Sequence, residues 1–165
     1  MFATKPISPE SVTSALAKAE RYRLLNEPSE AESICRDILE IDPNNAQAQI
    51  TLILALTDQI PGDSQAFASA LATAARLESD YDRAYYAGIA WERRAKARHS
   101  GGGQGARQYV YDWMMTAMQL FEEAEKLRAP GNDDAVLRWN ACVRYLALKQ
   151  LTPQPEEAPE PIVSE

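Results

Sequence analysis

The sequence predicts an all-α fold of about seven helices. Apolar residues recur at three- and four-residue steps through every patterned segment, as one buried face of a helix requires. No segment shows a convincing two-residue alternation of apolar and polar residues, which would be typical of a strand. Short junctions rich in Pro, Gly, Asn and Asp separate most of the segments, and such junctions are typical of turns between helices.

The first two helices have recognisable start signals. The first is expected from Pro9 to about Leu25, and Ser8 directly before Pro9 is a typical residue at a helix start. The second is expected to begin near Pro28, because the missing N–H of proline is tolerated at the first helical position. Both segments therefore read as helices with one apolar face.

The corner "EIDPNN", residues 40–45, ends the second helix and leads directly into the third. We expect Asp42 to accept hydrogen bonds from the free amides of the third helix, and Pro43 to lie in its first turn. The third helix, "AQAQITLILALTDQI", is apolar nearly all round, as a helix between neighbours should be. The corner is thus interpreted as a helix cap.

Four more helices follow with the same apolar periodicity. They are expected after "PGD" at 61–63, from near "SDYD" at 79–82, up to "APGND" at 129–133, and from about Asp133 to Lys149. The glycine-rich stretch at 101–105 separates the fifth helix from the sixth. It lacks the Lys-Ser/Thr pair of a phosphate-binding loop and follows a helix, so a flexible connection is expected.

The chain of 165 residues is long enough for one domain with its own core. We expect a flexible N-terminus at 1–8, a helical domain at 9–150 and a disordered acidic tail at 151–165. The last fourteen residues, "TPQPEEAPEPIVSE", hold four Pro and four Glu and no Lys or Arg. This segment is interpreted as a solvating tail or as a tether or short ligand for another domain.

Charge and hydropathy exclude several classes of partner. The net charge of −7 argues against binding to nucleic acid or to anionic lipid, which select basic surfaces. No apolar run approaches the length of a membrane span, and the start of the chain lacks signal- and transit-peptide patterns, so a cytoplasmic location is expected. Cys35 and Cys142 both lie inside apolar helical patterns and are expected to be buried thiols rather than a disulfide.

The spacing of four residues resembles a known repeat family. Ala31 follows Tyr22 by nine residues, and Cys35 and Pro43 follow Ala31 by four and twelve residues. This spacing resembles the tetratricopeptide repeat at its tyrosine, alanine, large apolar and proline positions. More degenerate units are found at 46–79, and in the two halves "AYYAGIAW" and "AMQLFEEA". The seventh helix would then be the terminal cap of about three repeats.

The resemblance implies a right-handed superhelical stack of antiparallel helix pairs whose first helices line a concave groove for peptides or proteins. The groove positions carried over by spacing are Leu16, Glu20, Arg23, Ile50, Leu54, Asp58, Tyr85, Ile89 and Glu92. Tyr85, Ile50 and Leu54 would form an apolar floor edged by the acidic members of that set. Such a floor suits a partner with apolar anchors and some positive charge. The alternative for each residue is a core or helix–helix contact.

Four basic residues lie close to the expected end of the fifth helix. Positive charge at a helix C-terminus is favoured by the helix dipole, which is sufficient reason for their presence. The alternative is a docking site for an acidic peptide, including the tail of the chain itself. These residues are Arg93, Arg94, Lys96 and Arg98.

These observations predict a small non-catalytic adaptor or scaffold that binds a protein or peptide partner and needs no cofactor or metal. One alternative is a self-associating module, because the uncapped ends of repeat stacks are apolar. The other is an enzyme or small-molecule binder that uses residues 99–108. His99 is the only histidine, and the sequence places no acid, base and nucleophile around it, so it is expected on the surface.

Overall fold

The computed structural model describes residues 2–103 and 105–153. In these residues all regular structure is helical, so the predicted all-α fold with about seven helices is confirmed. The elements are the 3-10 turn η1 (Pro9–Ser11) and the helices α1 (Val12–Leu24), α2 (Pro28–Ile41), α3 (Ala46–Gln59), α4 (Ala66–Ala74), α5 (Asp80–Gly101), α6 (Ala106–Leu127) and α7 (Asp134–Leu148).

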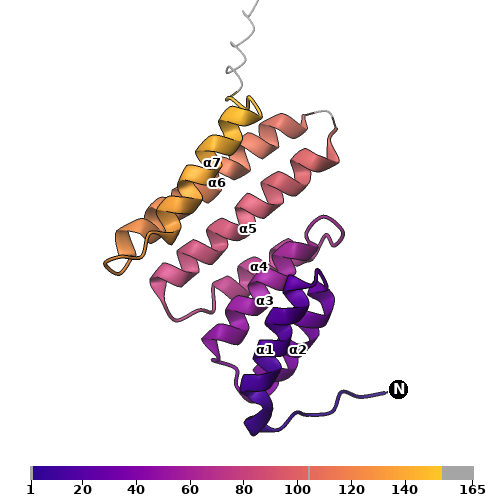
Figure 1. Ribbon diagram of the computed structural model, residues 1–165. Coiled ribbons are helices and arrows are strands. Elements are labelled where there is room, and N and C mark those ends of the chain that lie inside the picture. Colours follow the sequence, from indigo (N-terminus) through magenta and orange to yellow (C-terminus); the bar gives the residue numbers. More distant parts are fainter. Residues whose placement is uncertain (1, 104, 154–165) are drawn as a thin grey trace, which may run out of the picture.

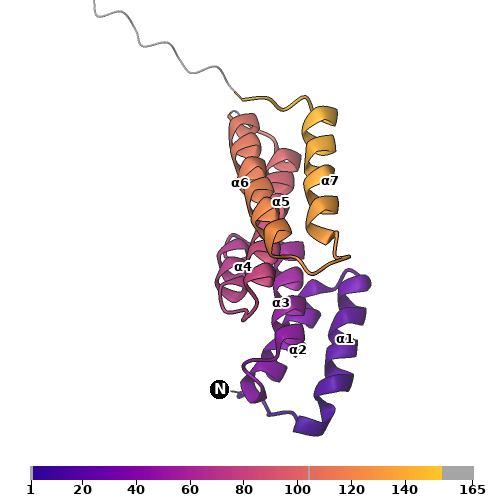
Figure 2. The same cartoon turned by 90° about the vertical axis from the view of Figure 1, so that its left-hand side faces the viewer.

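Each helix packs against the next one along the chain (Figure 1). The third helix, α3, also contacts α1 and α5, so the odd-numbered helices α1, α3 and α5 lie side by side. The seventh helix reaches the same face, because its side chains bond to those of α5. Figure 2 shows α1 and α7 along one edge of the molecule, with α3 and α5 beside them. The right-handed superhelix implied by the repeat resemblance stays an expectation.

The corner between α2 and α3 differs from the prediction. The residue that caps α3 is Asn45, whose Oδ1 accepts a hydrogen bond of 2.9 Å from the backbone N–H of Ala48. The Asp42 carboxylate instead accepts a bond of 2.9 Å from the side-chain amide of Asn45. Pro43 lies in the turn and not in the first turn of α3. The prediction that Asp42 caps α3 was wrong. Asp and Asn are equally good caps, and Asn45 is the one that directly precedes the first residue of α3.

The core has two main parts. One lies among α1 to α4 and includes the fully buried Ala19 and Ala31, whose small side chains allow α1 and α2 to approach closely. The other lies among α5, α6 and α7, around the fully buried Phe121 and Cys142. Leu151 is also buried in this second part, so the folded region reaches at least that residue. Both thiols are free and buried, as predicted.

The helices α5 and α6 are each 22 residues long and are joined by the glycine-rich stretch. Gly102 and Gly105 have φ values of 66° and 74°, a region that glycine enters without steric cost. Within the described residues, no helix combines the length and apolar character required to cross a membrane. The tail expected at 151–165 lies outside the described residues from 154 onward.

Candidate functional site

A cavity opens on the face formed by the odd-numbered helices. Its volume is about 710 Å³, and its lining residues come from the turn after α1, from the end of α3 and the turn after it, from α5 and from α7. We call it the odd-helix cavity. It is lined by Asn26, Thr57, Asp58, Pro61, Arg93, Lys96, Ala97, Ser100, Gly101 and Arg138.

Asp58 on α3 connects the three neighbouring odd-numbered helices at one end of the cavity. Its Oδ2 pairs with Nε of Arg23 on α1 at 2.7 Å, and its Oδ1 pairs with Nη1 of Arg93 on α5 at 2.9 Å. The Asp58 side chain is only 19% exposed, which strengthens both pairs relative to fully solvated ones. Each arginine is 35 residues away from Asp58 along the chain. Arg23 and Asp58 lie in the last turns of α1 and α3, and Arg93 lies in the second half of α5.

Glu92 lies beneath the cavity and is completely buried. Its carboxylate pairs with Nζ of Lys96 one turn further along α5, and with Nη1 of Arg138 on α7 at 3.4 Å. Burial alone lowers the pKa of Arg138, but the Glu92 carboxylate and the Tyr85 side chain nearby raise it overall. A buried carboxylate is stable only when such partners compensate its charge. Glu92 therefore holds two cationic side chains at the cavity wall.

The charge of the cavity is positive, as the alternative interpretation of the basic cluster at 93–98 allowed, and differs from the acidic edge expected for the groove. The two carboxylates, Asp58 and Glu92, are paired with four cations, which leaves an excess of two positive charges. About a third of the side-chain surface of Arg93, Lys96 and Arg138 stays exposed. The cavity thus presents accessible cations, and of the predicted acidic edge only Asp58 lines it.

The nine predicted groove residues do not form one surface. Three of them belong to the ionic network just described: Asp58 lines the cavity, Arg23 pairs with it, and Glu92 is buried below. Ile89 is also buried, so the expectation that it and Glu92 line an open groove is wrong. The half-buried members are Leu16, Ile50 and Leu54, and the exposed Glu20 accepts a hydrogen bond from Gln47.

Tyr85 packs between helices instead of forming the floor of a groove. Its ring lies 5.6 Å from that of Tyr81 and 5.9 Å from that of Phe121, centroid to centroid. It also borders a smaller cavity of about 340 Å³ together with Leu137 and Arg138 of α7. Its closest partners are thus on α5, α6 and α7.

The predicted basic cluster separates into different roles. Arg94 does not line the odd-helix cavity, and its guanidinium lies 4.2 Å from the ring centroid of Phe67 and 4.0 Å from that of Trp113. Burial lowers the pKa of Arg94, and the two rings compensate through cation–π contacts. Its neighbours Arg93 and Lys96 are instead members of the cavity wall.

His99 is half-buried, whereas a surface position was predicted. Its Nδ1 lies 2.6 Å from the hydroxyl of Tyr145, so it joins the last turns of α5 and α7. No group of three or more His, Cys, Asp or Glu side chains in the described part of the chain could hold a metal ion. The contacts of His99 are those of a residue that fixes two helices.

Sequence reasoning missed Asn26, Ser100 and Arg138 as members of the site. They come from the turn after α1, the end of α5 and the second turn of α7, and no spacing in the sequence links them. Arg93 carried a usable signal, because it follows Asp58 by the same interval by which Asp58 follows Arg23. No family model, no curated protein and no solved structure matches this chain.

Proposed function

We propose that this protein is a non-catalytic adaptor of the cytoplasm that binds a protein or peptide partner across its odd-numbered helices. The observation that carries the proposal is the odd-helix cavity, which α3, α5, α7 and the turn after α1 border and whose wall holds three partly exposed cations. A groove of this kind is where a stack of tetratricopeptide-like helix pairs would receive an extended segment.

Exposed apolar residues directly precede two of the cavity residues in the chain. Leu24 and Leu25 precede the cavity residue Asn26 and are 86% and 61% exposed, and Leu137 precedes Arg138 and is 63% exposed. Exposed apolar residues beside a polar cavity are typical of binding surfaces, in which apolar anchors supply affinity and charges supply specificity. The partner segment is therefore expected to carry carboxylates flanked by apolar residues.

Filling the cavity tests this proposal without removing an ion pair. Ala97 is half-buried on α5 and lines the cavity, whereas Ala72 is exposed on α4, away from it. The partner is first captured from the source cell with the wild-type chain, identified by mass spectrometry and purified. Isothermal titration calorimetry should then show that Ala97→Trp weakens binding at least tenfold, about 1.4 kcal/mol. Ala72→Trp should bind as the wild type does, and equal binding by both variants would place the partner elsewhere.

A second candidate function is self-association through α7. Leu137 and Leu148 are eleven positions apart on this helix, hence on one face, and both are largely exposed at 63% and 77%. Sedimentation velocity at increasing protein concentration separates the two functions. A monomer at all concentrations excludes self-association, and a dimer that Leu148→Asp dissociates supports it.

A further inference from the structure

We propose that the glutamate-rich segment 154–165 of this chain docks in the odd-helix cavity and competes there with a partner. This inference extends the proposed function to its regulation, because the same cavity is used. It can be tested without any partner, so the two proposals can fail separately.

The first argument is the charge of the two surfaces. The segment "QPEEAPEPIVSE" contains four Glu and no Lys or Arg. The cavity wall carries an excess of two positive charges, and Arg93, Lys96 and Arg138 keep about a third of their side-chain surface exposed. Charge-assisted hydrogen bonds from arginine and lysine to carboxylates are the strongest that such a wall can make. The segment and the cavity are therefore electrostatically complementary.

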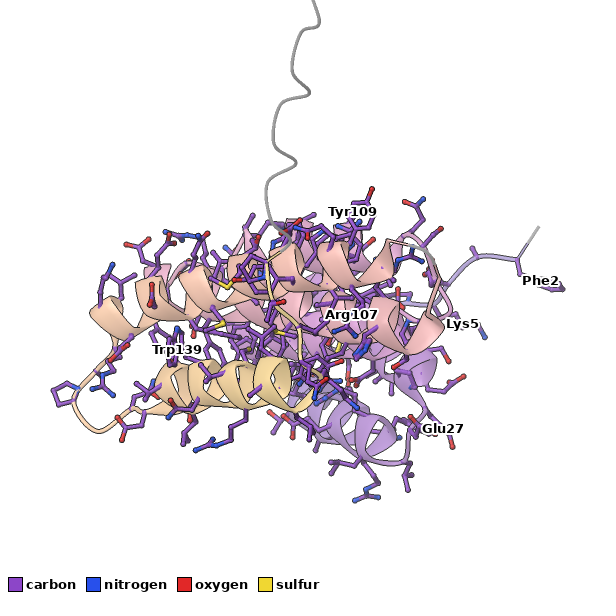
Figure 3. The ribbon with its side chains drawn as sticks, turned by 90° about the horizontal axis from the view of Figure 1, so that it is seen from above. Phe2, Lys5, Glu27, Arg107, Tyr109 and Trp139 are labelled. Carbon is purple, nitrogen blue, oxygen red and sulfur yellow. The ribbon has the colours of Figure 1, made fainter. Side chains whose placement is uncertain are left out.

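The second argument is the place where the chain leaves the fold. Arg107 at the start of α6, which is labelled in Figure 3, donates hydrogen bonds to the carbonyl oxygens of Lys149 and Gln150, at 3.3 Å and 2.6 Å. The contact between His99 and Tyr145 fixes this end of α7 to the last turns of α5. The next residue of α5 after His99 is Ser100, which lines the cavity. The end of α7, from which the chain continues towards the segment, thus lies close to the end of α5 that borders the cavity.

The third argument is reach. The twelve residues from 154 to 165 can span up to about 40 Å when extended, at roughly 3.3 Å per residue. The part of α5 that borders the cavity, residues 93–101, is about 13 Å long at 1.5 Å per residue. The segment is long enough to cross the cavity and to bring Ile162 and Val163 towards the exposed Leu24 and Leu25.

Tethering makes even a weak contact effective. A short linker holds its ligand at an effective concentration of about 1 mM. If the free segment binds with a Kd of about 0.1 mM, the tethered copy weakens any competitor about tenfold. A partner with a similar acidic segment would have to displace it, and any change in the charge of the segment would alter this competition.

Paramagnetic relaxation measured by NMR tests the docked position directly in the full-length chain. A nitroxide is attached at Ser164→Cys, and the native Cys35 and Cys142 do not compete for the reagent because both are fully buried. We expect loss of the amide signals of residues 96–101, with those of α2 unaffected. Unaffected signals at 96–101, or uniform loss over the whole chain, would overturn the proposal.

Charge variants test the cause of docking. The triple substitution Glu156→Gln, Glu157→Gln and Glu160→Gln should restore the signals of residues 96–101. Arg138→Gln should restore them as well, while Arg144→Gln, the same change at an exposed arginine of α7, should not. Each variant is first checked by circular dichroism.

A further experiment does not depend on the folding of Arg138→Gln. A labelled peptide of residues 152–165 has to compete with the attached segment for the cavity of the wild type, but not for that of the triple variant. The peptide should therefore bind the triple variant about tenfold more tightly than the wild type. Equal affinities would overturn the proposal.

Discussion

Gly88 of α5 lies directly against the ring of Phe121 of α6. A Cβ atom at position 88 would lie 2.6 Å from Cε1 and 2.9 Å from Cδ1 of that ring. Phe121 is completely buried, so its ring cannot move aside into solvent. The absence of a side chain at Gly88 is thus a condition for the close packing of the two longest helices.

Gly88→Ala should lower the free energy of unfolding by about 1–3 kcal/mol, as overpacking of a core does. This is opposite to the effect of helix propensity, which favours Ala over Gly by about 1 kcal/mol. Urea unfolding followed by circular dichroism measures the change. Gly101→Ala is the matched control, because nothing lies within 4 Å of a Cβ there, and it should leave stability unchanged or slightly raised. A Gly88→Ala variant as stable as the control would show that α5 and α6 separate easily.

Asp58→Asn should destabilise the fold by about 1–2 kcal/mol at low salt. The change removes the charge that Arg23 and Arg93 share, and both pairs are only partly exposed, between the range of surface pairs and that of buried ones. The difference from wild type should decrease at high NaCl concentration, since salt screens the accessible part of the interaction. Urea unfolding at the two salt concentrations checks both statements.

Asp112→Asn, the same change at an exposed position of α6, should have almost no effect. If the two variants lost equal stability, the Asp58 network would not hold α1, α3 and α5 together.

Most of the fold could be predicted because the helical signal is local. The apolar period and the proline at Pro28 are properties of neighbouring residues, and α2 does begin at Pro28. The cap at α3 could not be assigned in this way, because Asp42 and Asn45 are comparable caps and the choice depends on how the turn closes. The remaining differences in the helix ends are small.

The candidate site was much less predictable than the fold. An acidic residue such as Glu92 indicates negative charge in a sequence, but its buried position between Lys96 and Arg138 reverses the charge that the cavity presents. Arg138 lies 46 residues away from Glu92, and the two meet only because α7 packs back towards α5. Contacts of this kind depend on the packing angles of helices, which periodicity does not specify.

Stability should decrease as the pH rises from about 9 to 12. Burial, with smaller contributions from nearby carboxylates, raises the pKa of Cys35 and of Cys142 from 9.0 to about 12. In this range the unfolded chain releases both thiol protons while the folded chain keeps them. The free energy of unfolding therefore falls, by up to about 1.4 kcal/mol per pH unit for each thiol. Guanidinium unfolding at pH values on either side of 9.0 measures the slope.

The double variant Cys35→Ala, Cys142→Ala isolates this effect. It should lose stability less steeply just above pH 9 than the wild type does, because neither state then has a thiol to titrate. A residual decrease at higher pH is expected from Tyr86, whose pKa burial raises from 10.0 to about 12. Equal slopes for the two chains would mean that the thiols become accessible without unfolding.

For Tyr85 the sequence and the structure lead to opposite expectations. As a groove residue it should be dispensable for folding, and Tyr85→Ala should weaken partner binding without changing the melting temperature. Its ring instead stacks on Tyr81 and contacts Phe121, and it is only partly exposed. Tyr85→Ala should therefore lower the free energy of unfolding by about 2 kcal/mol, less than a fully buried aromatic would.

One further substitution at Tyr85 and one control at another tyrosine complete this test. Tyr85→Phe keeps the ring and loses only the hydroxyl near Arg138, so it should retain nearly all of the stability. Tyr109→Ala truncates a tyrosine of α6 that is 52% exposed and points outward in Figure 3, and it should change stability little. Thermal and urea unfolding of the three variants provide the comparison. If Tyr85→Ala were as stable as Tyr109→Ala, the ring would contribute little to the packing of α5 on α6. Tyr85 would then again be a candidate contact for the partner.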